Sequence, residues 1–153
     1  MEKIKGVIKE FVAFIETGCG TVEENESRLK QCCDKLEQSI SRISRNGTKT
    51  YTTTNIALSQ KVNRIKRLVH ERFPHFGHYS FTDPRNGRDG TSKKAQPVTG
   101  NVIDDITAIT NVFYDILGRL ENIDTGDALF YLEDNFKYCW GGNFKNLQMY
   151  LNS

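Results

Sequence analysis

No run of apolar residues in this 153-residue chain approaches the ~18 that a membrane-spanning helix needs. The amino-terminal stretch mixes lysines with apolar residues, but Glu10 and Glu16 interrupt it. Its apolar residues recur at helical spacing, which is typical of an amphipathic helix and not of a signal peptide. We therefore expect a cytoplasmic location and no membrane partner.

The chain also lacks the usual signatures of metal, nucleotide and catalytic sites. Its four cysteines include no C-x-x-C pair, and the spacing of His70, His75 and His78 is not that of a ligand set. We find no glycine-rich phosphate loop, nucleophile elbow or suitably spaced cysteine–histidine pair. We expect buried free thiols, no metal and no cofactor, and an enzyme is the minority interpretation.

Proline is scarce, and its three residues all fall between positions 74 and 100, where glycines also mark turns. We expect this segment to be one long irregular loop, in part mobile, because such a connection is unusual in a compact domain. Its aromatic first half is expected to lie against the helices through Phe76, Tyr79 and Phe81.

Elsewhere apolar residues recur at steps of three and four, which predicts amphipathic helices. The expected helices span about residues 4–15, 22–45, 55–73, 101–121, 125–140 and 144–151. A capping box at Thr21–Glu24 begins the second, and Gly141-Gly142 is expected to end the fifth. We predict an all-α single domain over residues 1–153, a five- to six-helix antiparallel bundle in which helix 101–121 is the most buried.

Three motifs support a family resemblance. An aromatic-Asp-Pro segment, Tyr79–Pro84, precedes a helix that opens Gly100-x-x-x-Asp104-Asp105-Ile106, and Asp127-Ala128-Leu129 is followed by Phe136 and Trp140-Gly141. From about Phe73 onward the chain thereby resembles a bacterial helical family of unassigned function, domain of unknown function five-zero-six-three. The resemblance implies a fold and no mechanism. This chain has Cys139 and Asn143 where the family has histidines, and Ala108 where the family has an acid. An activity that depends on those histidines or that acid would therefore be lost in this chain.

Two acids begin helix 101–121, where acids complement the helix dipole. A helical wheel puts Asp104 and Asp115 opposite the apolar face and Asp105 inside it, where a carboxylate must be paired or hydrogen-bonded. Asp105 therefore has two interpretations. It is either a structural acid with a partner such as an arginine, a backbone amide or the Trp140 indole, or a catalytic residue. Trp140 marks either a pocket or the core. The candidate polar site is therefore Asp104, Asp105, Asp115 and Trp140.

Charge is distributed unevenly along the chain. Residues 42–94 hold 12 basic and 3 acidic residues, whereas residues 95–153 hold 3 basic and 8 acidic ones. The candidate polyanion surface comprises Lys61, Arg64, Arg67, Arg85, Arg88, Lys93 and Lys94. Such runs are also typical of solvated helix faces, and the acidic end could neutralise this one within the molecule or across a dimer.

The sequence thus favours a non-enzymatic protein-interaction or self-association module, with an unknown protein partner or a homodimer. One alternative is a nucleic-acid or polyanion binder that uses the basic middle. A third hypothesis is a hydrolase-like enzyme that uses the acidic pair Asp104 and Asp105.

Overall fold

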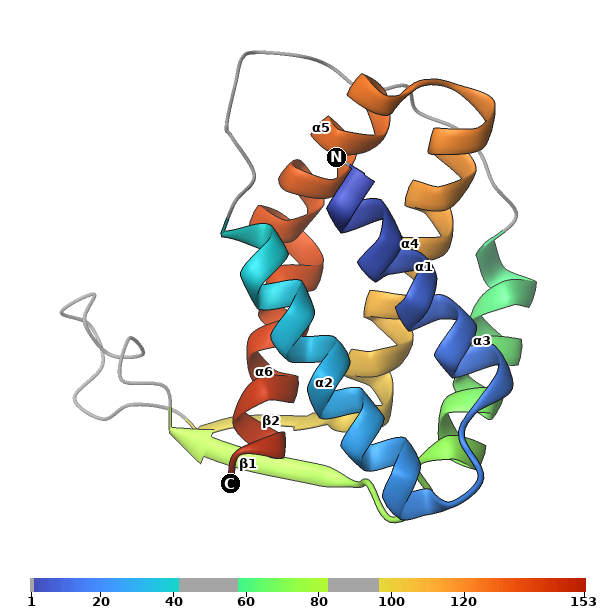
Figure 1. Cartoon of the computed structure of the whole chain (residues 1–153). Helices are drawn as coiled ribbons and strands as arrows, with labels where there is room; N and C mark the ends of the chain where they lie inside the picture. The colour runs from blue at the N-terminus through green and yellow to red at the C-terminus, as the bar shows by residue number, and fades with distance from the viewer. Residues whose placement is uncertain (1, 42–57, 83–96) are drawn as a thin grey trace, which may run out of the picture.

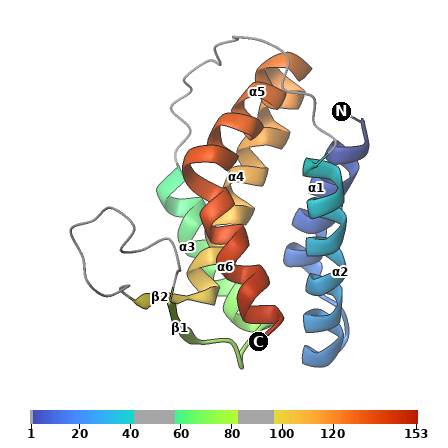
Figure 2. The ribbon, with the colours of Figure 1, turned by 90° about the vertical axis from the view of Figure 1, so that its left-hand side faces the viewer.

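The computed structural model describes residues 2–41, 58–82 and 97–153. Its helices are α1 (Glu2–Thr17), α2 (Val22–Ile40), α3 (Leu58–Arg72), α4 (Val102–Asn122), α5 (Thr125–Asn135) and α6 (Gly141–Leu151), with a π-helical turn, η1 (Phe136–Trp140), between the last two. The predicted all-α, antiparallel, bundle-like class is confirmed. Figure 2 shows α1 and α2 as one layer beside the other helices.

Helix α4 is the centre of the fold, packing against α1, α3, α5 and α6. Six of its eleven buried residues are apolar, and they include Ile106, Ile109 and Phe113, which are all fully buried. The Phe113 ring packs edge-on against Phe11 of α1 and against Trp140 of η1, with ring centroids 5.2 Å apart in each case. As predicted, α4 buries more of its residues than any other helix that the structure describes.

The ends of the helices form largely as the sequence predicts. The Thr21 hydroxyl accepts a hydrogen bond from the Glu24 amide at 3.1 Å, and the Glu24 carboxylate accepts one from the Gly20 amide at 3.0 Å. At the start of α5, the Asp124 side chain accepts from the Asp127 amide at 2.7 Å. Such caps satisfy amides that the helix itself leaves without partners.

The segment expected to be irregular contains a short antiparallel ribbon. Strand β1 (His78–Thr82) pairs with β2 (Pro97–Asn101), with Tyr79 opposite Gly100. The residues of β1 alternate polar and aromatic, but those of β2 do not, so periodicity did not reveal that the two segments pair. Figure 1 shows the ribbon lying across one end of the bundle, where β2 leads directly into α4.

The prediction that Gly141-Gly142 ends a helix is wrong. Helices α5, η1 and α6 follow one another without a break, and the Gly141 amide donates to the Phe136 carbonyl five residues earlier, which is the π-helical pattern. A β-carbon on Gly141 would lie 2.1 Å from the Phe136 carbonyl oxygen. Gly141 therefore permits the turn instead of stopping the helix.

The two neighbouring glycines should respond in opposite ways to alanine. Gly141→Ala would force the backbone apart and lower the free energy of unfolding by about 1–3 kcal/mol. Gly142 is exposed with nothing within 4 Å of an added β-carbon, so Gly142→Ala should raise it by about 0.5–1 kcal/mol. Denaturant unfolding of both variants in dilute solution measures the difference. Equal effects would contradict the assignment of the close approach to Gly141 alone.

Candidate functional site

Asp105 is the centre of a polar cluster that joins three elements. Its side chain is buried, with 4% exposed, although it lies in the first turn of α4. The Tyr79 hydroxyl of β1 donates to Oδ2 at 2.6 Å, and the Asn143 amide of α6 donates to Oδ1 at 2.8 Å. The burial of Asp105 agrees with the prediction from the wheel, whereas its partners are the side chains of Tyr79 and Asn143 and not an arginine, a backbone amide or the Trp140 indole.

The ribbon explains how Tyr79 reaches Asp105. Pairing of Tyr79 with Gly100 brings the tyrosine ring over the glycine, where an added β-carbon would lie 2.5 Å from the hydroxyl oxygen. Immediately after Gly100, the Asn101 side chain caps α4 by accepting from the Ile103 amide at 2.9 Å. The glycine that opens the Asp-Asp motif is therefore required by the tyrosine side chain that crosses it.

Three parts of the motifs that carry the family resemblance converge at this cluster. Tyr79 comes from the aromatic segment, Asp105 from the Asp-Asp motif, and Asn143 stands where the family has a histidine. These residues are far apart in the sequence, and no periodicity brings them together. The structure thus gives the motifs a shared physical role, which is to hold β1 and α6 against the start of α4.

Burial controls the ionisation of the cluster. It raises the pKa of Asp105, and the hydrogen bonds from Tyr79 and Asn143 oppose that rise. Burial, followed by the hydrogen bond to Asp105, raises the pKa of Tyr79 well above its usual range. Tyr79 therefore remains a protonated donor at neutral pH. Each carboxylate oxygen accepts a bond from within the chain, an arrangement suited to holding elements together.

Asp104, the other acid of the pair, lies outside the cluster. Its side chain is 57% exposed and forms an ion pair with Lys66 of α3 at 2.9 Å. The structure therefore separates the two neighbours, and the carboxylates do not face a common centre. An exposed pair of this kind contributes little to stability.

Asp115 is buried, which corrects the prediction that it faces away from the core. Helix α5 folds back along α4 and covers that side. Arg119, four residues later, has its Nε 3.4 Å from an Asp115 oxygen and its Nη1 2.8 Å from an oxygen of Asp127. The Arg119 guanidinium also lies 4.0 Å from the ring centroid of Tyr131. The wheel failed because it could not show that α5 brings Asp127 and Tyr131 to a buried arginine.

Trp140 belongs to the core, which was one of the two locations, core or pocket, that the sequence left open. It is fully buried, its ring packs edge-on against Phe136 at 4.8 Å, and its indole N–H donates to the Leu132 carbonyl at 3.3 Å. Of the candidate polar site, Asp105 joins a cluster with Tyr79 and Asn143, and Asp115 joins a second one with Arg119 and Asp127. Tyr79, Asn143 and Arg119 were missed as members of polar clusters.

The basic candidate surface is partly neutralised from within the molecule. Arg64 of α3 forms a two-pronged ion pair with Glu16 of α1, at 3.0 and 2.7 Å, and Tyr114 of α4 also donates to Glu16. The Arg64 hydrogen bond holds the pKa of Glu16 below its ordinary value. Arg67 is exposed, and Lys61 lies in the first turn of α3. The remaining candidates, Arg85, Arg88, Lys93 and Lys94, lie outside the described residues.

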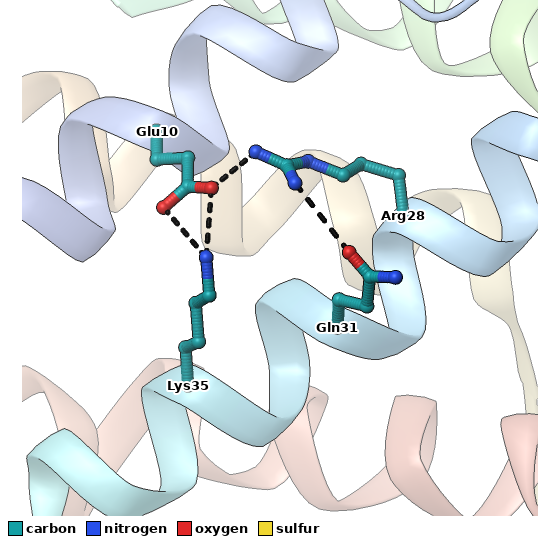
Figure 3. A network of polar contacts seen from close by, with 4 residues as sticks. All are labelled: Glu10, Arg28, Gln31 and Lys35. Atoms are coloured by element: carbon teal, nitrogen blue, oxygen red, sulfur yellow. Dashed lines mark hydrogen bonds and ion pairs between the residues drawn. The ribbon is translucent and has the colours of Figure 1, made fainter.

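Helices α1 and α2 are joined by a surface ionic network (Figure 3). Glu10 accepts from Lys35 at 2.9 and 3.2 Å and also pairs with Arg28. The hydrogen bond from Lys35 is the main influence that lowers the pKa of Glu10. Because these side chains are 31–47% exposed, solvent screens their attraction. The network orients the two helices without marking a reactive site.

Two of the four cysteines are buried and two are exposed. Cys32 and Cys33 are buried free thiols, as predicted, and burial raises their pKa values to about 11 and about 12. They therefore remain protonated and unreactive at neutral pH. Cys19 and Cys139 are exposed, which corrects the prediction for them. His70, His75 and His78 are also exposed, and the described part of the chain contains no group of three or more residues that could hold a metal ion.

Comparison with known proteins identifies a fold relative. A crystal structure of protein BF1032 from Bacteroides fragilis is similar to this chain with a TM-score of 0.72, covering 99% of this chain and 89% of that one. The sequences are 14% identical, so the likeness concerns the fold alone. No family model and no curated protein matches the chain, and the family resemblance stays a prediction. Within the described ranges, no helix is both long and apolar enough to cross a membrane.

Removing the Asp105 carboxylate should destabilise the protein. Asp105→Ala leaves the Tyr79 hydroxyl and the Asn143 amide without their acceptor, and we expect the free energy of unfolding to fall by about 1–3 kcal/mol. The matched control, Asp104→Ala, removes an exposed ion pair and should cost about 0.5 kcal/mol or less. Denaturant unfolding of both variants measures the two losses in unfolding free energy. Equal losses, or a gain for Asp105→Ala, would mean that the cluster does not hold the elements together.

The buried arginine should be far more sensitive than the surface lysine of Figure 3. Arg119→Met removes the cation next to two buried carboxylates, Asp115 and Asp127, and we expect a loss of about 3–5 kcal/mol in unfolding free energy. Lys35→Met removes a screened surface contact and should cost roughly 0–1 kcal/mol. Thermal and denaturant unfolding of both variants measures the contrast, and comparable losses would refute it.

Proposed function

We propose that this chain is a cytoplasmic, non-enzymatic helical module that works by binding a protein partner or a second copy of itself. The proposal includes membership of the bacterial family that the three motifs resemble. The observation that carries it is an exposed aromatic residue, Tyr138, which has 73% of its surface accessible on the outer side of η1. Such exposure is unusual for a large ring in a chain whose other aromatic side chains largely pack together.

Tyr138 is part of a continuous helix face. We define the outer face of α6 as Tyr138, Gly142, Lys145 and Met149, four exposed residues separated by steps of four, three and four. The spacing of Gly142, Lys145 and Met149 keeps them on one side of α6, and Tyr138 lies in the π-helical turn η1 that precedes it. Met149 is 48% exposed, and Lys137 lies 5.0 Å from the centroid of the Tyr138 ring. Figure 2 shows α6 on the near side of the molecule.

The composition of this face is that of a binding surface. Tyrosine and methionine are enriched in protein interfaces, because each buries a large area and adapts to a neighbour. An exposed apolar residue standing alone needs no explanation. Here two of the three large exposed hydrophobic residues that the structure describes share one face, with Ile123 the third.

Two observations favour binding over the enzymatic hypothesis. Asp105 has both oxygens engaged by Tyr79 and Asn143, and Asp104 points to Lys66 on another side. A hydrolase would need an acid and a base arranged around one substrate position. The acidic pair is therefore better explained by the stability of the fold.

Polyanion binding is the second candidate function. Exposed Arg67 and His70 on α3 are the observation in its favour. Against it, Arg64 and Lys66 already pair with acids of α1 and α4, which lowers the positive potential that phosphates would meet. Binding to nucleic acid would fall steeply with salt, whereas an interface based on Tyr138 and Met149 would depend on it weakly.

The proposal can be tested in the native cells with a photoreactive phenylalanine. We expect the probe to form covalent adducts with a protein when it replaces Tyr138, because the ring would lie in the interface. The matched control places it at Asn63, an exposed position on α3. Irradiation followed by gel analysis measures the adducts. Absence of adducts at position 138, or equal labelling at both positions, would contradict the proposal.

A further inference from the structure

We propose that Asp105, with Tyr79, Asn143 and Asn146 around it, is a proton-accepting latch that holds β1 and α6 to the start of α4 more tightly when Asp105 is protonated. The inference is independent of the proposed binding face. It rests on the kinds of groups that surround the carboxylate, which are one hydroxyl and two side-chain amides. Each of these groups can both donate and accept a hydrogen bond, so the latch can take up a proton without losing a contact.

The partners of Asp105 are neutral. Tyr79 of β1 and Asn143 of α6 donate to its two oxygens at 2.6 and 2.8 Å. No lysine, arginine or histidine of the described residues pairs with this carboxylate. An ionised Asp105 is therefore a buried anion whose charge is opposed only by hydrogen bonds, and burial penalises that form.

The other titratable groups near the cluster do not supply a counter-charge. Asp104 is also negative, and its own charge is paired with Lys66 of α3 at 2.9 Å. His78, next to Tyr79 in β1, is exposed, and successive side chains of a strand point to opposite faces. On α6, the ring of Tyr150 lies 6.4 Å from the ring of Tyr79 and is uncharged at neutral pH. Strand β2 contains no titratable side chain.

Two hydrogen-bond patterns satisfy the same atoms. With Asp105 ionised, the Tyr79 hydroxyl donates to Oδ2 and accepts from the side chain of Asn146. When a proton from water binds to Oδ2, the acid can donate to the Tyr79 oxygen. The hydroxyl proton of Tyr79 then turns to the side-chain oxygen of Asn146, which a flip of that amide presents. Asn143 donates to Oδ1 in both patterns, so one proton enters and every hydrogen bond is kept.

The latch responds to pH in the opposite direction to the ion pairs of the surface. Burial raises the pKa of Asp105, so the folded protein binds this proton more tightly than the unfolded chain does. Its contribution to stability therefore increases as the pH falls from its folded pKa towards the ordinary value of 3.8. The hydrogen bond from Arg64 lowers the pKa of Glu16, so the contribution of Glu16 is present above 4.5 and is lost as the pH falls through its folded pKa.

Titration of the side-chain carboxyl carbons by NMR tests the latch in the unaltered protein. We expect a midpoint above 3.8 for Asp105 and one below 4.5 for Glu16, which is the internal control. Hydrogen exchange of the Val102 amide, bonded to the Gly77 carbonyl at 3.1 Å, reports the joint between the ribbon and α4. Between the Asp105 midpoint and 3.8, its protection should rise by at most about tenfold per pH unit after correction for the intrinsic rate. An Asp105 midpoint at or below 3.8 would overturn the inference.

Asp105→Asn imitates the protonated acid, because its amide nitrogen donates where the acid hydroxyl would. We expect its denaturant midpoint at neutral pH to equal or exceed that of the wild type, and the protection of the Val102 amide to lose its acid-dependent rise. The matched variant Asp105→Ala has neither group and should have a lower midpoint. If Asp105→Asn lowers the midpoint as much as Asp105→Ala does, Tyr79 cannot reverse its hydrogen bond and the inference fails.

A double-mutant cycle tests the part of Asn146. In the Asp105→Asn protein Tyr79 donates to Asn146, so adding Asn146→Ala should lower the denaturant midpoint more there than in the wild type. The control is Lys145→Ala, at the exposed neighbouring position on α6, which should have the same effect in both backgrounds. Equal effects of Asn146→Ala in the two backgrounds would exclude the reversal of the hydrogen bonds.

Discussion

The burial of polar side chains on α4 is the constraint on which the rest of the structure depends. This helix is covered on most of its sides, yet it carries Asp105, Asp115 and Arg119 inside. A buried charge without a partner is costly, so each of these residues restricts what can pack beside it. Asp105 needs donors, which β1 and α6 supply, and Arg119 needs acids, which α4 and α5 supply. Apolar contacts stabilise the bundle, whereas these polar contacts select which neighbour lies on which side.

The π-helical turn between α5 and α6 allows Trp140 to be buried in the core while Asn143 reaches Asp105. One extra residue in the turn changes the direction in which all later side chains point. Trp140 consequently enters the core beside Phe113, Asn143 reaches Asp105, and Tyr138 remains outside. Gly141 is what allows this, since a side chain there would collide with the Phe136 carbonyl. The inward fit of α6 and its exposed outer face therefore have a common origin in a single backbone irregularity.

The sequence predicted those features that depend on periodicity and local chemistry. The bundle of helices, the cap at Thr21 and the burial of Asp105 followed from spacing, because a short acid within an apolar arc cannot extend to solvent. It could not predict features that depend on which segments meet. Asp115 looked exposed until α5 covered it, and a Gly-Gly pair has the same sequence appearance at a helix end and at a π-turn. The ion pair of Lys66 with Asp104 likewise joins residues that no local pattern connects.

The residue at position 143 shows what this version of the cluster can do. In the family that the chain resembles, a histidine stands there; here Asn143 donates to Asp105 through an amide. An imidazole at this place could exchange a proton with the carboxylate near neutral pH, whereas an amide donates the same hydrogen bond without titrating. Asn143 thus makes the contact that holds α6 to α4 through a group that does not titrate near neutral pH. Burial and the hydrogen bond to Asp105 also keep Tyr79 protonated, so this side chain holds β1 to α4 as a donor. Tyr138 of η1 and Met149 of α6 lie outside this cluster and remain exposed.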